Sequence, residues 1–378
     1  MRQPCSIVAL AVAGLLMGVA LPAFAAKRVT VKQLDELLIA AHGKPDGRVA
    51  EQLSGLVLTE RASSARLSLW EKDFPGRRTR DTLIALADVS AFLDLPAAEI
   101  RDRSVPNPDE QRRIVSVTAE YVIKALPRLP NFLATRETAY FEDSPSEQSF
   151  NPFYMLNRVG LTEYQPLHVV GRSSVAVTYR DGREVVDAET QKGHKPDTHS
   201  DWLTTIGEFG PILAIVVGDA IHSTVTWGHW EQGATGPQAV LRYAVPQEKS
   251  HYKVVSSCLE GIGQQFPAYH GEIAVNPADG NILRLTIVAD MNPTCRIAMA
   301  NIVVEYGAVA IGGQPYICPV KSVSVSEMPA FDASNYAPAV PLPLKTRLND
   351  VLFMDYHLFR AEFRILTGNS GEQPETNP

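Results

Sequence analysis

His229 and Glu231 are the residues whose types and spacing come nearest to catalytic chemistry. They stand two positions apart in the segment TWGHWE, and residues two apart lie on the same face of a β-strand. On the wall of a cavity, an imidazole and a carboxylate could work as the acid–base pair of a hydrolase. Buried polar pairs are more often structural hydrogen bonds, and that is the interpretation we favour.

A polar loop at residues 194–201 (HKPDTHSD) holds residue types that bind metals. His194, Asp197 and His199 could supply nitrogen and oxygen ligands to zinc or calcium. Their spacing matches no established metal-binding motif, and a simply solvated loop is the alternative that we favour. We therefore predict no metal and no cofactor, and keep these residues as candidates only.

Motifs of the large enzyme classes are absent or incomplete. Ser250 and Lys253 match the Ser-x-x-Lys tetrad of penicillin-binding proteins, but the companion Ser-Asp-Asn and Lys-Thr-Gly motifs are missing. The sequence contains no Gly-x-Ser-x-Gly, no His-Glu-x-x-His, no P-loop and no complete glycine-rich dinucleotide motif. We therefore predict no catalytic residue and favour a protein that is not an enzyme.

The N-terminus has the three parts of a secretory signal peptide. Arg2 is followed by an apolar run at residues 7–20, then by Pro22 and the small-x-small triplet Ala23-Phe24-Ala25. A membrane anchor is the weaker alternative, since a spanning helix needs about 20 apolar residues. We predict that residues 1–25 are removed and that the mature chain is exported to the periplasm or beyond. We expect it to be soluble there, without a transmembrane anchor.

Cysteine usage fits an exported protein but leaves the pairing open. Cys258, Cys295 and Cys318 follow the predicted cleavage site, and disulfides are permitted outside the cytoplasm. An odd number allows one bridge with a free thiol, or no bridge. The pair we predict, if one forms, is Cys295 with Cys318, and three buried reduced thiols are the alternative.

Composition bounds the class of protein. The chain has 378 residues, 45% hydrophobic and 20% charged, with a formal net charge of -7. This balance is typical of folded domains, and the length accommodates two of them. The negative charge and the lack of a basic stripe argue against a nucleic-acid partner.

Residues 26–127 show helical periodicity. Thr30 and Gln33 form a capping box, and Gly43 ends the first helix. Further helices are predicted from residue 46, after residue 59, and at 78–93. Asn107 and Pro108 start the fifth helix, whose apolar face we place at Ile114, Val117, Tyr121 and Ala125. Together these helices predict a small N-terminal bundle or an array of helical hairpins.

Residues 128–368 change to a period of two. Runs such as 132–141, 174–179, 281–289, 302–311, 316–325 and 353–366 alternate apolar and polar side chains between short turns. They predict about ten strands in one large antiparallel sheet, curved or closed. A proline-rich loop at 329–343 interrupts the series, and residues 369–378 read as a disordered tail.

One segment of the sheet region breaks this pattern. Pro211 is followed by an unbroken apolar run at residues 212–217, and Pro suits the first turn of a helix. A helix that is apolar on every side must be buried, and the concave face of a curved sheet would bury it. A buried strand is the alternative. Residues here and on the neighbouring strand are the candidate contacts of an apolar ligand: Ile212, Ile215, Val216 and Trp227.

Several short segments carry a family resemblance. They are residues 129–132 (LPNF), 269–272 (YHGE), 276–282 (NPADGNI) and 355–359 (DYHLF). In these and in the order of its elements, the chain from 129 to 366 resembles exported bacterial proteins similar to the periplasmic lipoprotein-carrier (outer-membrane lipoprotein-sorting) superfamily. The resemblance implies an incomplete β-barrel whose helices cover a concave apolar cavity for acyl chains. It implies no catalytic residues.

Three functions are therefore carried forward. The first is a soluble exported protein that holds an apolar or lipid-like ligand in a concave sheet. The second is a protein-interaction or envelope-assembly module with a solid core and an envelope protein as partner. The third is a hydrolase that uses His229 and Glu231, or the loop that contains His194.

Overall fold

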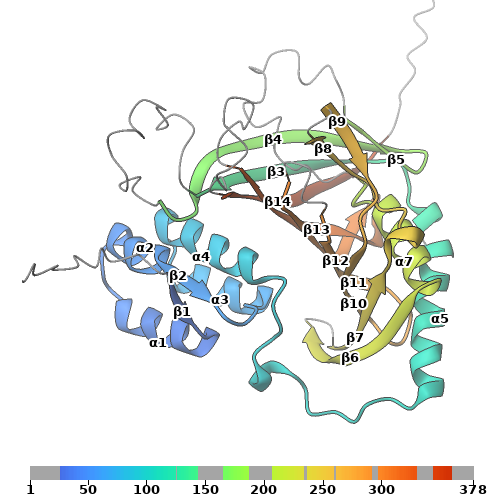
Figure 1. Ribbon diagram of the computed structural model, residues 1–378, viewed down its shortest axis with the longest axis horizontal. Helices are drawn as coiled ribbons and strands as arrows, with labels where there is room; N and C mark the ends of the chain where they lie inside the picture. The colour runs from blue at the N-terminus through green and yellow to red at the C-terminus, as the bar shows by residue number, and fades with distance from the viewer. Residues whose placement is uncertain are drawn as a thin grey trace, which may run out of the picture.

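The computed structural model has an α+β fold, with a helical N-terminal unit beside a large open sheet (Figure 1). It describes residues 26–124, 126–143, 165–186, 207–233, 236–258, 261–291, 297–329 and 344–359. The predicted signal peptide, the candidate metal loop with His194, Asp197 and His199, the predicted disulfide partner Cys295 and the predicted tail all lie outside these residues.

The N-terminal unit is built around its own apolar core. Its elements are β1 (Lys27–Val29), α1 (Val31–Ala41), α2 (Asp46–Ser54), β2 (Leu56–Leu58), α3 (Ser64–Asp73) and α4 (Arg77–Ser90). The predicted capping box is confirmed: the Gln33 amide donates to Thr30 Oγ1 at 3.2 Å, and the Thr30 amide donates to Gln33 Oε1 at 2.9 Å. Leu34, Leu53, Trp70 and Leu83 meet in the core.

The N-terminal unit also contains two short strands that the helical periodicity did not predict. β1 and β2 pair in parallel, with Arg28 opposite Val57. Each strand has only three residues, which is too short for alternation to be detected in the sequence. The pair forms because packing on α1 and α4 brings two distant segments side by side.

Helix α5 (Pro108–Lys124) starts as predicted but packs elsewhere. Asn107 Oδ1 accepts the Glu110 amide at 2.9 Å, which caps the helix. However, Ile114 and Val122 belong to the core of the sheet, whereas the core of the N-terminal unit contains no residue of α5. Figure 1 shows α5 on the side of the sheet away from α1–α4. The predicted bundle of residues 26–127 therefore ends before α5.

The predicted antiparallel sheet is confirmed. It has ten strands in the order β5-β4-β3-β14-β13-β12-β11-β10-β7-β6, every neighbouring pair is antiparallel, and it is not closed. The strands are β3 (Phe132–Glu142), β4 (His168–Arg180), β5 (Arg183–Val186), β6 (Thr224–Gly233), β7 (Gly236–Val245), β10 (Tyr269–Val275), β11 (Ile282–Ala289), β12 (Met299–Ile311), β13 (Gln314–Pro329) and β14 (Leu344–Leu358). A separate hairpin is formed by β8 (Val254–Cys258) and β9 (Gly261–Gln265).

Strand β14 begins earlier than the predicted 353–366. It starts at Leu344 and pairs on both sides, with β13 and β3. Lys345, Arg347 and Asn349 are buried polar residues on this strand. Because polar residues occupy these buried positions, the apolar alternation that would have marked the strand is missing.

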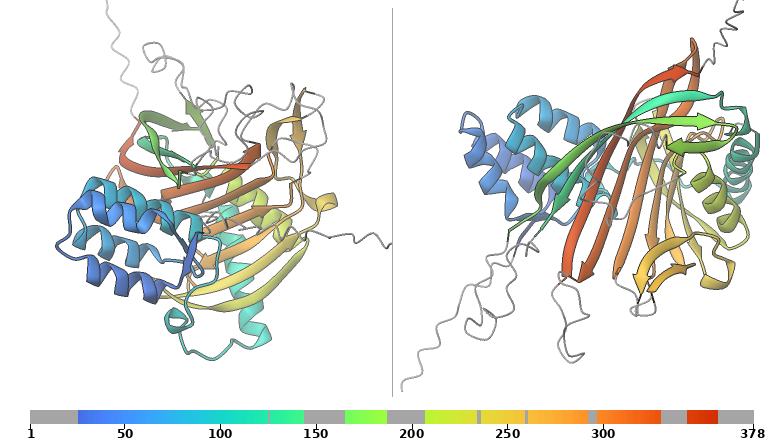
Figure 2. Two further views of the ribbon diagram at one scale, coloured as in Figure 1. Left: turned by 60° about the vertical axis from the view of Figure 1, so that its left-hand side comes forward. Right: turned by 90° about the horizontal axis from the view of Figure 1, so that it is seen from above.

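Both faces of the sheet are covered, as the second view in Figure 2 makes clear. The inner face, which carries Leu285, Ile302 and Val304, packs against α5 and α7 (Pro211–Ile221). The outer face, which carries Val303, Val323, Val325 and Leu348, packs against α4. In the residues that the structure describes, no helix is both long enough and apolar enough to span a membrane.

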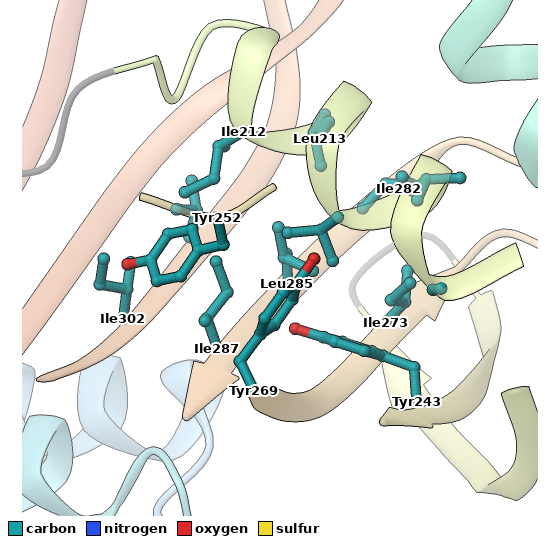
Figure 3. Packing of buried hydrophobic residues seen from close by; sticks show 14 of the residues in the cluster. Ile212, Leu213, Tyr243, Tyr252, Tyr269, Ile273, Ile282, Leu285, Ile287 and Ile302 are labelled. Atoms are coloured by element: carbon teal, nitrogen blue, oxygen red, sulfur yellow. The ribbon is translucent and has the colours of Figure 1, made fainter. Parts of the chain in front are cut away.

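Helix α7 is the predicted apolar helix. Pro211 occupies its first turn, and Leu213, Val216 and Val217 are buried against the inner face. Figure 3 shows this packing around Tyr243, Tyr252 and Tyr269. The alternative of a buried strand is therefore excluded, and the sheet curves around a helix that fills much of its concave side.

Candidate functional site

A pocket opens at the margin of the inner face, beside α5. Its volume is about 330 Å³. The walls come from α5, from the following 3₁₀ turn η2 (Leu126–Arg128), from the turn between β10 and β11, and from the ends of β12 and β13. The lining residues are Tyr121, Leu126, Leu129, Asn281, Ala308, Pro315, Tyr316 and Ile317.

One wall is fixed by a close contact between α5 and the β10–β11 turn. Gly280 has a φ of 74°, and a Cβ there would lie 2.3 Å from the carbonyl oxygen of Val117. Arg113 Nη2 also donates to the Pro277 carbonyl at 2.9 Å. Since only glycine allows both this backbone conformation and this approach, the turn sequence sets how closely α5 meets the sheet.

The opposite wall owes its shape to small residues. Ala308 faces Ile317 across the β12–β13 pair, and Ala310 faces Pro315. Small side chains on β12 leave space that larger strand residues would fill. Gly312 and Gly313, with φ of 59° and 82°, form the turn between β12 and β13. Tyr316, which follows this turn, lines the pocket.

The pocket is apolar with a polar corner. Burial raises the pKa of Tyr121 to about 12, so this phenol stays protonated at neutral pH. Asn281 Nδ2 donates to Asp279 Oδ2 at 2.8 Å, which places a carboxylate next to the lining. No lining residue that the structure describes is basic. Such a site can bind an apolar molecule and offer hydrogen bonds to one end of it.

The predicted ligand contacts lie elsewhere. Ile212 and Val216 are 5% and 0% exposed and pack in the core between α7 and the sheet. Ile215 and Trp227 are partly buried against the same cluster. None of the four lines the pocket. Sequence reasoning missed Ala308 and Tyr316, although Gly307, Ala308 and Ala310 put three small residues within four positions of a strand and so indicated local space.

His229 and Glu231 do contact each other, but in a structural network. His229 Nε2 lies 2.9 Å from Glu231 Oε1, and Arg284 Nη2 reaches the same oxygen at 2.8 Å. Arg61 of the N-terminal unit pairs with it as well. Burial alone would raise the pKa of Glu231, but the hydrogen bond with His229 and the Arg61 charge together lower it. The pair is not part of the pocket, so the geometry favours the structural interpretation.

Cysteine and metal predictions are only partly covered by the described residues. Cys318 carries a free thiol rather than a disulfide, and burial raises its pKa to about 12. Its predicted partner Cys295 is outside the described residues. Within the described ranges, no group of three or more His, Cys, Asp or Glu side chains could hold a metal.

Comparisons with protein-family models, with curated proteins and with solved structures found no match to this chain. Function is therefore argued from the pocket and its surroundings.

Proposed function

We propose that this chain binds a small apolar or lipid-like molecule in the pocket between α5 and the β12–β13 hairpin. The observation that carries the proposal is the pocket of about 330 Å³ with mostly aliphatic and aromatic walls. Small-molecule sites commonly have volumes of roughly 300–1,000 Å³ and such a lining. This site thus replaces the α7 residues Ile212, Ile215 and Val216 as the proposed point of contact.

The volume also limits the ligand. One water takes about 30 Å³ of liquid, so the pocket accommodates a molecule of roughly a dozen non-hydrogen atoms. A single short chain or one or two rings would fit. The cargo of a lipoprotein carrier, with several long acyl chains, would exceed it. We therefore propose a relative of such carriers in architecture that holds a smaller molecule.

The proposed place of action is outside the cytoplasm. It rests on the N-terminal charge, apolar run and small-x-small triplet. N-terminal sequencing of the protein recovered from the envelope or medium tests it, and an intact Met1 would contradict it.

Filling the pocket tests the binding proposal. In Ala308→Trp, an indole occupies the space beside Ile317, and affinity for the two-ring fluorescent probe 1-aminonaphthalene should fall at least tenfold. The matched control is Ala176→Trp, an exposed position on β4, which should bind as the parent does. Mass spectrometry of organic extracts of the gently purified protein would identify a natural ligand. Equal probe binding by Ala308→Trp and the parent, or no binding by the parent, contradicts the proposal.

The second candidate is a protein-interaction or envelope-assembly module. It is favoured by the solid packing of α7 in the concave side of the sheet, where Leu213 and Val216 are 1% and 0% exposed. A photo-crosslinker in place of Ile39, which is 76% exposed on α1, should then capture one defined envelope protein. A hydrolase is not proposed, because Glu231 is held by two arginines away from the pocket.

A further inference from the structure

Asp279 is held in a fixed position beside the pocket. Its Oδ2 accepts from Asn281 Nδ2 at 2.8 Å and from Asn276 Nδ2 at 3.1 Å, while its Oδ1 accepts the Asn281 amide at 3.0 Å. Asn281 itself lines the pocket. The carboxylate is exposed, and its hydrogen bond to the lining residue Asn281 keeps it next to this corner of the pocket.

In the part of the chain that the structure describes, three basic residues near this corner have other partners or lie off the pocket. Lys124 pairs with Glu120, and Arg113 pairs with Glu110 and the Pro277 carbonyl. Arg128, next to the lining residue Leu129, is exposed and does not line the pocket. An anionic headgroup at this corner would therefore lie near the Asp279 carboxylate, with no basic lining residue to offset the repulsion. A hydroxyl or an ammonium group could instead donate hydrogen bonds to oxygen atoms there.

We propose that the pocket selects neutral or amine-headed amphiphiles with a single short chain and discriminates against fatty acids with the same chain. This inference rests on the proposed function, and it adds the chemical class of the ligand. Like charges at close range weaken binding, and opposite charges strengthen it, most strongly where the site is partly shielded from water.

The test compares decanol, decylamine and decanoate, each below its critical micelle concentration, at pH 7.5 and low salt. Each competes with 1-aminonaphthalene for the pocket of the mature chain. Decylamine should bind at least as tightly as decanol, and decanoate at least tenfold more weakly. Asp279→Asn removes the charge and keeps one of the two oxygens that accept hydrogen bonds within the turn. It should reduce the ratio of decylamine affinity to decanoate affinity at least fivefold.

The matched control is Asp290→Asn, which removes an exposed carboxylate just past the far end of β11 and should leave the ratio unchanged. Decanoate binding equal to decanol, or an unchanged ratio in Asp279→Asn, would overturn the ligand class while leaving the binding site intact. If none of the three compounds binds the parent chain, the proposed function fails, and the ligand class fails with it.

Discussion

Glu231 holds together residues that are far apart in the chain. Its carboxylate meets Arg61 of the N-terminal unit, Arg284 of β11 and His229 of its own strand. All these side chains are at least four-fifths buried. Glu272 lies 3.2 Å from Arg284 as well, so two carboxylates balance two buried guanidinium groups, and removing one member leaves the charges unbalanced.

The change Glu231→Gln should therefore destabilise the fold. The glutamine keeps the size but removes the carboxylate between Arg61 and Arg284, so that Arg61 is buried beside a neutral amide and Arg284 keeps only its pair with Glu272. The free energy of unfolding should fall by roughly 3 kcal/mol, as expected when one partner of a buried ion pair is removed. Urea titration measures it. The exposed pair of Glu120 with Lys124 is the control, and Glu120→Gln should cause no measurable change. An equally small effect at Glu231 would contradict the network.

Helix α4 is the element that joins the two units. Its apolar side packs on the outer face of the sheet, and its Asp88 carboxylate lies 2.6 Å from Lys321 Nζ of β13. Asp350 of β14 lies 3.1 Å from the same ammonium, and Glu305 of β12 adds a further negative charge nearby. Two buried carboxylates thus share one cation. Burial and this crowding raise the pKa of Asp88 to about 8.

A pH dependence follows from the helix–sheet contact. The pKa of Asp88 is higher in the folded chain than its ordinary value of 3.8, so the folded state binds more protons between these two values. Its contribution to stability is therefore greatest at acidic pH and is lost as pH rises towards 8. Asp88→Asn should flatten the decline in the free energy of unfolding between pH 5 and pH 8. Urea titrations across this range measure it. If the free energy of unfolding changes with pH equally in parent and variant, Asp88 is not the group responsible.

At the scale of the whole molecule, the sheet is enclosed by helices on both faces. The N-terminal unit has a separate core, yet it covers the outer-face residues Val303, Val323 and Leu348. Two ion pairs also join this unit to the sheet: Arg242 of β7 pairs with Asp94 at 2.8 Å, and Arg172 of β4 pairs with Asp81 at 2.5 Å. The unit therefore serves as the cover of an apolar sheet face.

Removing this cover should cause self-association. A chain of residues 107–378 would expose the apolar outer face, and exposed patches of this kind associate. Size-exclusion chromatography with light scattering should find oligomers, where residues 26–378 remain monomeric. Adding separately produced residues 26–100 should restore the smaller species. If residues 107–378 are monomeric and do not bind the added residues 26–100, this role is contradicted.

Local features of the sequence determined much of the fold. The capping box of Thr30 with Gln33 and the cap at Asn107 act within one turn of a helix, so their residues alone specify them. The alternation of strands such as β11, and the burial of the apolar helix after Pro211, follow from the same local patterns. Strand β14 escaped prediction in part, because Lys345, Arg347 and Asn349 stand where apolar residues would have marked it.

Only the tertiary structure decided which distant elements meet. The pocket exists because α5 packs beside the β12–β13 hairpin and not against the N-terminal helices. Gly280 allows the β10–β11 turn to approach α5 closely. The sequence contains Tyr121, Ala308 and Tyr316 but no periodic signal that joins them. Likewise, the local pattern predicted that His229 and Glu231 would share a strand face. That this pair is part of a structural ion-pair network depends on Arg61 and Arg284, which come from distant parts of the chain. Periodicity indicates which side of an element is buried. Long-range packing determines which other elements that side contacts.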